Sequence, residues 1–195
     1  MKKHILPAIK LSLVCLVLFI LIYPGMLWAL SQFAPGRGEG KTLETDSHVY
    51  YEQVGQAFSS DAYFWSRPSQ VNYNAAGSGA SNLASSNPAY LKTVEERLNH
   101  FLERNPAVSR DQVPIDLITA SGSGLDPHIS LATARVQIPR LAAARGISIN
   151  ALEKLVDEQK ESALWGLFGP VKVHVLKLNI ALDKLTEKRG GNDHE

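Results

Sequence analysis

Hydrophobic residues divide the chain into one long uniform run and a remainder in which shorter apolar runs alternate with polar ones. Residues 11–36 contain no charged side chain and consist mostly of Leu, Val, Ile, Phe and Trp. A bilayer is crossed by about 20 apolar residues, so the run predicts a transmembrane helix over residues 11–33. We expect a short cytoplasmic N-terminus, residues 1–10, before this helix and a single domain, residues 34–195, after it.

A secretory signal peptide also places basic residues before an apolar run, but its apolar region is about 7–15 residues long and ends in small residues. Here the run continues through residues 27–29, where Leu-Trp-Ala has a large residue in place of a small one. A retained anchor is therefore favoured. The positive-inside rule keeps the lysines before the anchor in the cytoplasm, which places the domain in the periplasm of a Gram-negative cell. These lysines are Lys2, Lys3 and Lys10.

A Pro-Gly pair interrupts the predicted span. Pro24 and Gly25 should kink the helix or loosen its packing, and such residues are common in lipid-embedded helices. The pair also fits a position that faces a partner helix, because glycine lets two backbones approach closely. The sequence leaves both interpretations open.

After the span, the apolar spacing predicts a mixture of helices and strands. We expect a Pro/Gly-rich linker over residues 34–41, a long surface loop over residues 66–87 and a frayed tail from about residue 187. The expected helices are 45–58, 88–104 with Asn87 as its cap, one from Ser130 that Pro139 interrupts before Gly146, 149–161, and a last turn over 180–185. The expected strands are 113–119 and 171–175. No regular strand–helix–strand alternation occurs, so the fold class is α+β.

The charge of the chain is divided in the same way as its hydrophobicity. The formal net charge of +1 is the sum of +3 over residues 1–35 and −2 over residues 36–195. A mildly acidic domain argues against nucleic-acid binding, which leaves a basic footprint, and one span does not enclose a transport path. The single cysteine, Cys15, lies in the span, so the domain has no disulfide, thiolate zinc site or cysteine nucleophile.

Three residues of the domain have the types found in a hydrolase triad. Ser121, Asp126 and His128 lie close together in sequence, whereas triads are usually assembled from distant segments and the serine sits in a strand–turn–helix context. Asp126 and His128 alone also fall short of the three or four ligands that a metal site needs. A local hydrogen-bonded turn is favoured, because Asp and Ser side chains bond nearby backbone amides.

The long loop offers a second kind of site. Residues 77–82 are Gly- and Ser-rich and could cradle an anion, but they lack the Lys and Ser/Thr of a phosphate-binding loop. A surface that meets another protein is favoured. Arg67, next to Pro68, could anchor this loop through a forked hydrogen bond or an ion pair, and the aromatic residues 63–65 before it suit either a core or an interface.

Longer motifs resemble one known family. The matching segments are Arg67-Pro68-Ser69, Tyr73-Asn74-Ala75, residues 78–83, Ser86-Asn87-Pro88, residues 113–130 (VPIDLITASGSGLDPHIS), residues 137–146 (QIPRLAAARG) and residues 173–179 (VHVLKLN). Through them, nearly the whole chain resembles the C-subunit family (KdpC) of the bacterial Kdp potassium-transporting P-type ATPase. The Tyr-Pro pair in the span also fits that family.

The resemblance implies a non-catalytic accessory subunit of a high-affinity, ATP-driven potassium uptake complex in the inner membrane. Such a subunit is needed for assembly and activity, and is described as a catalytic chaperone that raises the ATP affinity of the ATPase subunit. The implied partners are the potassium-conducting subunit, the P-type ATPase subunit and the bilayer. ATP and potassium are handled by the complex, and no cofactor or metal is assigned to this chain. A domain outside the cytoplasm does not touch cytoplasmic ATP, so we expect any effect on ATP affinity to pass through the membrane subunits.

The motif residues become candidates for interface or structural roles, with no catalytic residue among them: Pro24, Gly25, Arg67, Pro68, Tyr73, Asn74, Ser81, Asn82, Asn87, Ser121, Gly124, Asp126, His128, Arg140 and Asn179. Two alternatives remain beside this interpretation. One is a membrane-anchored periplasmic hydrolase that uses Ser121 or Ser123 with His128. The other is a membrane-anchored binding module.

Overall fold

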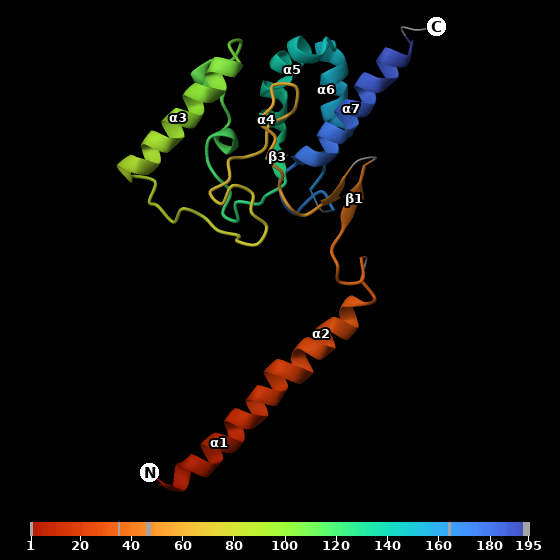
Figure 1. Cartoon of the computed structure of the whole chain (residues 1–195). Helices are drawn as coiled ribbons and strands as arrows, with labels where there is room; N and C mark the ends of the chain where they lie inside the picture. The colour runs from red at the N-terminus through yellow and green to blue at the C-terminus, as the bar shows by residue number, and fades with distance from the viewer. Residues whose placement is uncertain (1, 35, 46–47, 164, 193–195) are drawn as a thin grey trace. The chain divides into compact units, whose positions relative to one another are not determined.

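The chain has one apolar helix followed by a mixed region of helices and sheets, as the sequence predicts (Figure 1). The computed structural model describes residues 2–34, 36–45, 48–163 and 165–192. They form two compact units, Met1–Glu52 and Gln53–Glu195. The expected boundaries of the transmembrane helix, after residue 10 and after residue 33, depend on where the membrane lies, and they stay a prediction.

The first unit begins with a helical segment over Lys3–Ser31 that is long and apolar enough to cross a membrane. It comprises α1 (Lys2–Val17), a π-helical turn (Leu18–Ile22) and α2 (Tyr23–Ser31). Pro24 lies two residues after this turn, so the carbonyl four residues before it belongs to the turn. Proline has no N–H to donate and its ring clashes with the carbonyl four residues earlier, so a wider turn accommodates it. The predicted interruption is therefore a local widening of the helix.

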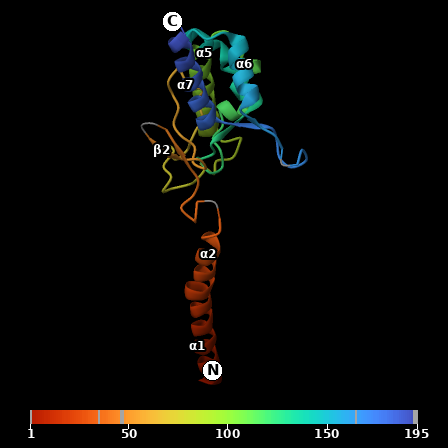
Figure 2. The same ribbon diagram turned by 90° about the vertical axis from the view of Figure 1, so that its right-hand side faces the viewer.

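A β-hairpin replaces the helix predicted over residues 45–58. Its strands are β1 (Thr42–Glu44) and β2 (Val49–Tyr51), which pair antiparallel (Figure 2). The helix prediction is wrong because aromatic and β-branched residues in β2 favour a strand. The Thr45 side chain also accepts the amide of His48 at 3.2 Å across the turn. Asp46 and Ser47, either of which could have capped such a helix, lie outside the described residues.

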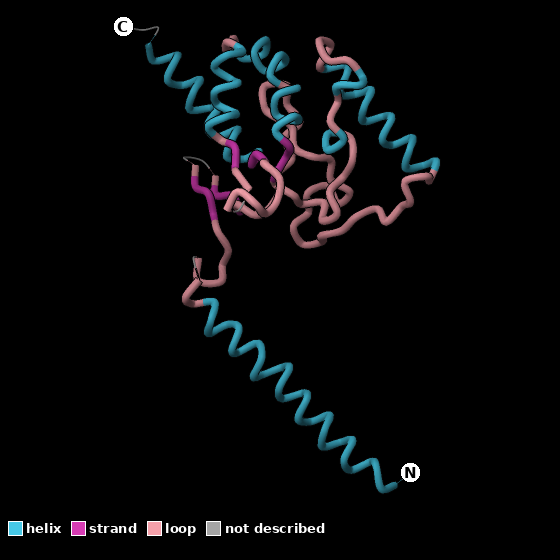
Figure 3. Tube along the Cα trace, turned by 180° about the vertical axis from the view of Figure 1, so that it is seen from behind, coloured by secondary structure: helices cyan, strands magenta, loops and turns pink. Residues whose placement is uncertain are grey.

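The second unit combines helices with a small antiparallel sheet, and long loops connect them (Figure 3). The helices are α3 (Pro88–Arg104), α4 (Leu131–Val136), α5 (Ile138–Arg145), α6 (Ile149–Glu158) and α7 (Val175–Asn192). The sheet has the order β3-β5-β4, with strands β3 (His128–Ser130), β5 (Lys172–His174) and β4 (Lys160–Glu161).

Capping residues place the helix ends where the sequence predicts them. Asn87 begins α3, and its Oδ1 accepts the amide of Ala89 at 2.9 Å. Ser130 caps α4, and Gly146 ends α5 with a φ of 64°. The interruption of this helix lies at Gln137, two residues before the predicted position. Pro139 lies in the first turn of α5, where backbone N–H groups have no partner within the helix, so the missing N–H of proline costs no helical hydrogen bond.

Two other expected elements differ from the structure. Residues 113–119 form no strand. A 3-10 turn (Ile115–Leu117) replaces it, because Pro114 removes a ladder donor and two adjacent residues, Leu117 and Ile118, are both buried. The helix expected over 149–161 ends at Glu158, and the next residues pair as β4.

The last helix is longer than the predicted turn over residues 180–185. α7 begins at Val175, directly after β5, and continues to Asn192 where a frayed tail was expected from about residue 187. Val175, Leu178 and Leu182 are buried at helical spacing, but the β-branched run before them hides this pattern in the sequence. Residues 193–195 lie outside the described residues.

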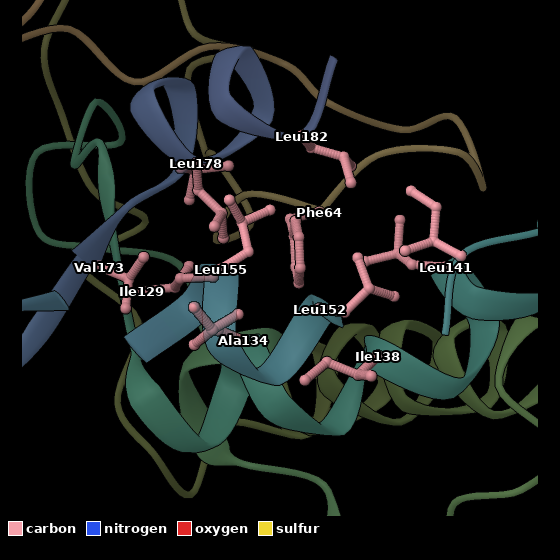
Figure 4. Close-up of a cluster of buried hydrophobic side chains, with 13 residues drawn as sticks. Phe64, Ile129, Ala134, Ile138, Leu141, Leu152, Leu155, Val173, Leu178 and Leu182 are labelled. Atoms are coloured by element: carbon pink, nitrogen blue, oxygen red, sulfur yellow. The ribbon is translucent and has the colours of Figure 1, made fainter. Parts of the chain in front are cut away.

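The hydrophobic core of the second unit consists of two clusters. Phe64 is fully buried at the centre of the first, among side chains from α5, α6, α7 and the sheet (Figure 4). Trp65 belongs to the second cluster, which it forms with Leu98 and Phe101 of α3 and with Leu117 and Ile118. Successive side chains of an extended segment point to opposite sides. Phe64 therefore packs into one cluster and Trp65 into the other, and both aromatic residues belong to the core.

The backbone of this extended segment is bonded by side chains from helices. Asn179 of α7 accepts the Phe64 amide at 2.9 Å and donates to the Phe64 carbonyl at 3.0 Å. Gln137 accepts the Trp65 amide at 2.8 Å. The two side chains thus supply the bonds that a neighbouring strand would supply, which explains why polar groups are buried here.

Two arginines of α5 complete this arrangement. The Arg140 guanidinium donates to the carbonyls of Asp61 and Tyr63 and to Asn105 Oδ1, and it lies 4.5 Å from the centre of the Trp65 ring. Burial lowers the pKa of Arg140 to about 10, which leaves it charged at neutral pH. Arg145 donates to a carbonyl of the same segment, that of residue 62, and pairs with Asp183 of α7 at 2.8 Å.

We expect Arg140→Lys to lower the free energy of unfolding by about 2–4 kcal/mol. Lysine keeps the charge but loses the planar fork, so buried carbonyls are left without donors. The matched control is Arg135→Lys in α4, where an exposed pair with Asp157 at 3.1 Å should be worth less than about 0.5 kcal/mol. Urea unfolding of the full chain in detergent, followed by circular dichroism, measures both. Equal effects in the two variants would contradict the assignment.

Candidate functional site

The loop of residues 66–87 carries no helix or strand, as predicted, and it wraps around a Gly- and Ser-rich turn. Ser69 Oγ donates to the Gly124 carbonyl at 2.6 Å, and the Gly79 amide donates to the Ser123 carbonyl at 2.9 Å. Segments more than 40 residues apart in sequence are thereby joined at the surface of the second unit.

Gly124 is required by this close approach. It has a φ of 69°, and a Cβ atom there would lie 2.7 Å from Val71 Cγ2 and 2.9 Å from the Gly79 carbonyl oxygen. A larger residue would be strained in its backbone and would push the loop away. Ser121, at the start of the same turn, is buried, and its carbonyl accepts the Gly124 amide at 3.2 Å.

Other motif residues of the loop bond to the loop itself. The Tyr73 hydroxyl donates to the Arg67 carbonyl at 2.5 Å, and burial raises the pKa of Tyr73. Asn74 and Ser81 each accept the backbone amide two residues later, and Asn82 adopts a positive φ of 53°. These bonds and the backbone conformation at Asn82 define the course of the loop.

A chain of charged groups begins where the loop meets the turn. Arg67 Nη1 lies 3.1 Å from Asp126 Oδ2, and Asp126 Oδ1 lies 3.2 Å from His128 Nδ1. On its other side, His128 Nε2 lies 3.4 Å from Glu161 Oε2 of β4. The anchoring ion pair predicted for Arg67 therefore has Asp126 as its partner, and His128 lies between two carboxylates.

The chain continues across the sheet. Glu161 also lies 3.7 Å from Lys172 Nζ of β5 and 3.6 Å from Lys177 Nζ of α7. The His128 ring meets the ring of His174 edge to face at 5.1 Å, because the two residues are register partners in β3 and β5. The site is thus connected to both edges of the sheet.

A groove of about 540 Å³ lies beside this cluster. Asp116 lies in the groove wall, where its carboxylate accepts the Ser130 amide at 2.8 Å and the Thr133 hydroxyl at 2.5 Å, so it stabilises the start of α4. The polar lining comprises Arg67, Asp116, Asp126, His128, Ser130 and Lys172. The lining carries two cations, Arg67 and Lys172, and two carboxylates, Asp116 and Asp126, so it has no excess of one sign to attract an ion.

The cluster does not form a hydrolase triad. Both ring nitrogens of His128 face carboxylates, whereas a general base needs one nitrogen on the serine hydroxyl. Ser123 Oγ accepts the Leu125 amide at 3.1 Å, which is the local hydrogen-bonded turn that the sequence favours. Among the described residues, no group of three or more His, Cys, Asp or Glu is placed to hold a metal ion.

The remaining motif residues lie elsewhere. Arg140 and Asn179 are buried around residues 61–65, and Pro24 and Gly25 are in the apolar helix of the first unit. Pro68 lines a separate hollow of about 170 Å³ beside Trp65 and Arg97. The predicted set is therefore divided among different parts of the chain, and its functional role stays a prediction.

Sequence reasoning did not single out Glu161, Gln137 or Arg145. Gln137 and Arg145 lie in a matched motif, and polar side chains on an apolar helix face are the signal that could have identified Gln137. Glu161 meets His128 only because β4 and β3 flank β5, and a single sequence carries no signal of that pairing.

The electrostatics of the cluster give Asp126 an unusual pKa. Burial raises the pKa of this carboxyl, but hydrogen bonds from the side chain and backbone of His128, together with the charge of Arg67, outweigh burial and hold it at about 2. A carboxyl with a lowered folded-state pKa stabilises the fold fully above its unfolded value of about 3.8. That contribution is lost as the pH falls toward 2.

We expect Asp126→Asn to lower the free energy of unfolding by about 1–2 kcal/mol at pH 7, since the side chain is about a third exposed and partly screened. The difference from the unmodified chain should shrink between pH 4 and pH 2, where the carboxylate becomes protonated. Urea unfolding of the full chain in detergent at several pH values measures this. A difference that persists at pH 2 would show that charge is not its source.

Comparison with known proteins identifies the family to which the chain belongs. The profile of the family "K+-transporting ATPase, c chain" matches residues 5–184. A "Potassium-transporting ATPase KdpC subunit" from Flavobacterium psychrophilum is 44% identical over 184 residues, covering 94% of this chain and 99% of the relative. Proteins of the same name from Bacteroides thetaiotaomicron and Geobacter sulfurreducens are 42% and 43% identical, covering 93% and 94% of this chain and 98% of each relative. The match includes the apolar helix, the loop, the charged cluster and the two arginines of α5, and the chain belongs to the KdpC family of K+-transporting ATPase subunits.

Proposed function

We propose that the chain is a non-catalytic accessory subunit of an ATP-driven, high-affinity potassium uptake complex in the inner membrane. The observation that carries this proposal is the family match over residues 5–184, which includes both the apolar helix and the second unit. The relatives are named as subunits of a potassium-transporting ATPase. In this proposal the N-terminus is cytoplasmic and unit Gln53–Glu195 lies on the periplasmic side.

The geometry of the charged cluster supports a non-catalytic role. His128 is held between Asp126 and Glu161, and Arg67 is paired with Asp126. Each of these side chains has a structural partner at hydrogen-bond or ion-pair distance, so the cluster holds loop, turn and sheet together. A hydrolase or a binding module would need at least one group directed at a ligand.

We assign the partners as the potassium-conducting subunit and the P-type ATPase subunit. In the first unit, a Cβ atom added at Gly25 would meet nothing within 4 Å in the chain itself, and the helix around it is exposed. A neighbouring helix can therefore approach closely beside Pro24 and Gly25. In the second unit, the loop of residues 66–87 is exposed over most of its length after Ser69 and is hydrogen-bonded to the turn it wraps, which suits a docking surface for the potassium-conducting subunit.

The catalytic-chaperone role follows as a coupling between sites. A periplasmic unit does not touch cytoplasmic ATP, so its binding must favour the conformation of the ATPase subunit that has the higher nucleotide affinity. Such an effect is a coupling free energy, typically about 1–3 kcal/mol, and it acts in both directions. ATP should then also raise the affinity of the complex for this chain.

We expect the complex purified without this chain to assemble poorly, or to have a potassium-stimulated ATPase activity about tenfold lower at limiting ATP. A tenfold effect corresponds to about 1.4 kcal/mol of coupling free energy. The chain alone should hydrolyse no ATP, since the proposal assigns it no catalytic residue. Activity assays with and without added chain, over a range of ATP concentrations, measure both effects. Unchanged assembly and activity without the chain would reject the proposal.

The membrane orientation has its own test. In a Cys15→Ser background, a cysteine introduced at the exposed position Gln70 should react with an impermeant maleimide added outside intact spheroplasts. A cysteine introduced at Lys3 is the control, and it should react only after lysis. The opposite pattern would reverse the orientation.

A further inference from the structure

An apolar tip projects from the sheet of the second unit. Residues 162–171 connect β4 to β5 and contain no charged side chain. Within this tip, Trp165 is 83% exposed, Leu167 81% and Phe168 61%. Figure 2 shows the connection as a blue loop extending away from the helices of its unit. Val171, also exposed, lies at the end of the same loop, whereas the exposed large apolar side chains elsewhere in this unit are scattered over separate elements.

Two contacts shape the described part of the tip. The Gly166 amide donates to the Ala163 carbonyl at 2.9 Å, which closes a turn, and Trp165 and Gly166 both adopt positive φ angles of 54° and 73°. The rings of Trp165 and Phe168 meet edge to face at 6.2 Å. No atom lies within 4 Å of a Cβ built on Gly166 or Gly169, so the described surroundings leave open space around the tip.

We propose that this tip inserts into the headgroup region of the bilayer that holds the chain's own apolar helix. It would give unit Gln53–Glu195 a second attachment to the membrane surface. The proposal rests on the membrane anchor of the proposed function, but it holds for either orientation of the chain. Both sides of a membrane present the same kind of interface.

The length of the connecting chain favours lipid as the occupant. The apolar helix ends at Ser31 and the second unit begins at Gln53, so 21 residues lie between them. Fully extended, they reach about 70 Å at most, so the unit always stays close to a membrane surface. Tethering makes that contact intramolecular, and a small apolar area then suffices where it would not hold a free protein.

The chemistry of the tip also fits lipid. Tryptophan prefers the membrane interface, where its ring is in an apolar region and its N–H reaches water. The described residues between β4 and β5 lie in no helix, and irregular backbone is not tolerated in the hydrocarbon region, so insertion is restricted to the hydrated headgroup level. A protein interface normally adds a polar rim with direct hydrogen bonds, and the tip has no charged group to provide one.

Cations at the base of the tip complement this arrangement. Lys160 and Lys172 flank it and are 46% and 42% exposed, and each lies 3.7 Å from a carboxylate, of Asp157 and Glu161 respectively. Their ammonium groups can therefore turn toward lipid phosphates when the tip is inserted.

The proposal is tested with a spin label on Leu167→Cys in a Cys15→Ser background. The full chain is placed in nanodiscs of phosphatidylethanolamine and phosphatidylglycerol. We expect collisions of the label with oxygen to exceed those with a water-soluble nickel complex. Leu91→Cys, which is also exposed and lies on α3, is the matched control and should show the reverse. Both positions are exposed, so neither substitution should disturb folding.

Each alternative outcome overturns the proposal. A label at residue 167 that meets nickel as freely as at residue 91 would show that the tip stays in water. A label shielded from both reagents would show that protein covers it, either a second copy or, in the complex, a partner subunit. Because the full chain alone suffices for the experiment, failure here leaves the proposed potassium-transport role untouched.

A second measurement uses Trp165 itself. In a Trp28→Phe background, lipids brominated near the headgroup should quench the tryptophan fluorescence of the full chain, and Trp165→Phe should remove this quenching. Trp65 is buried in the core and supplies the unquenched reference. Quenching that is unaffected by Trp165→Phe would contradict insertion of the tip.

Discussion

The second unit depends on how the backbone of residues 61–65 is hydrogen-bonded. The segment runs between two hydrophobic clusters, where an unpaired amide or carbonyl would cost about 1–3 kcal/mol. In the described structure it pairs with no strand. Asn179, Gln137 and Arg140 supply its bonds instead. Because these side chains come from α7, α5 and the residue before α5, the segment fixes the position of both helices as a central strand would.

The same segment also fixes the start of the surface loop that follows it. Phe64 faces one cluster and Trp65 the other, and the chain continues directly into Ser66 and Arg67, which bond to residues 56 and 126. The course of the following loop is therefore set by the core. The ion pair between Arg67 and Asp126 joins that loop to the turn before β3, and the turn in turn requires a glycine at position 124.

The sequence predicted what depends on neighbouring residues and missed what depends on distant ones. Asn87, Ser130 and Gly146 act within one helical turn, so their capping roles could be read directly, as could the anchor helix and the α+β class. The hairpin of β1 and β2 was missed because a helical spacing of polar residues outweighed the strand preference of Val49–Tyr51, whereas β-branched runs misled at the 3-10 turn of Ile115 and at the start of α7. The pairing of His128 with Glu161 requires the order of the sheet, which no local rule gives.

The polar side chains of the second unit are used to hold positions, and this bears on how such a subunit acts. A chain without its own chemistry influences a partner only by binding one of the partner's states more tightly than another. That difference is weakened if the chain itself deforms, so a rigid contact surface is an advantage. Arg140 and Arg145 bond the backbone of residues 61–63 to α5, and the cluster around His128 joins the loop, the turn and the sheet. If the loop keeps its shape, a change in the conformation of the partner alters the free energy with which the chain binds that partner.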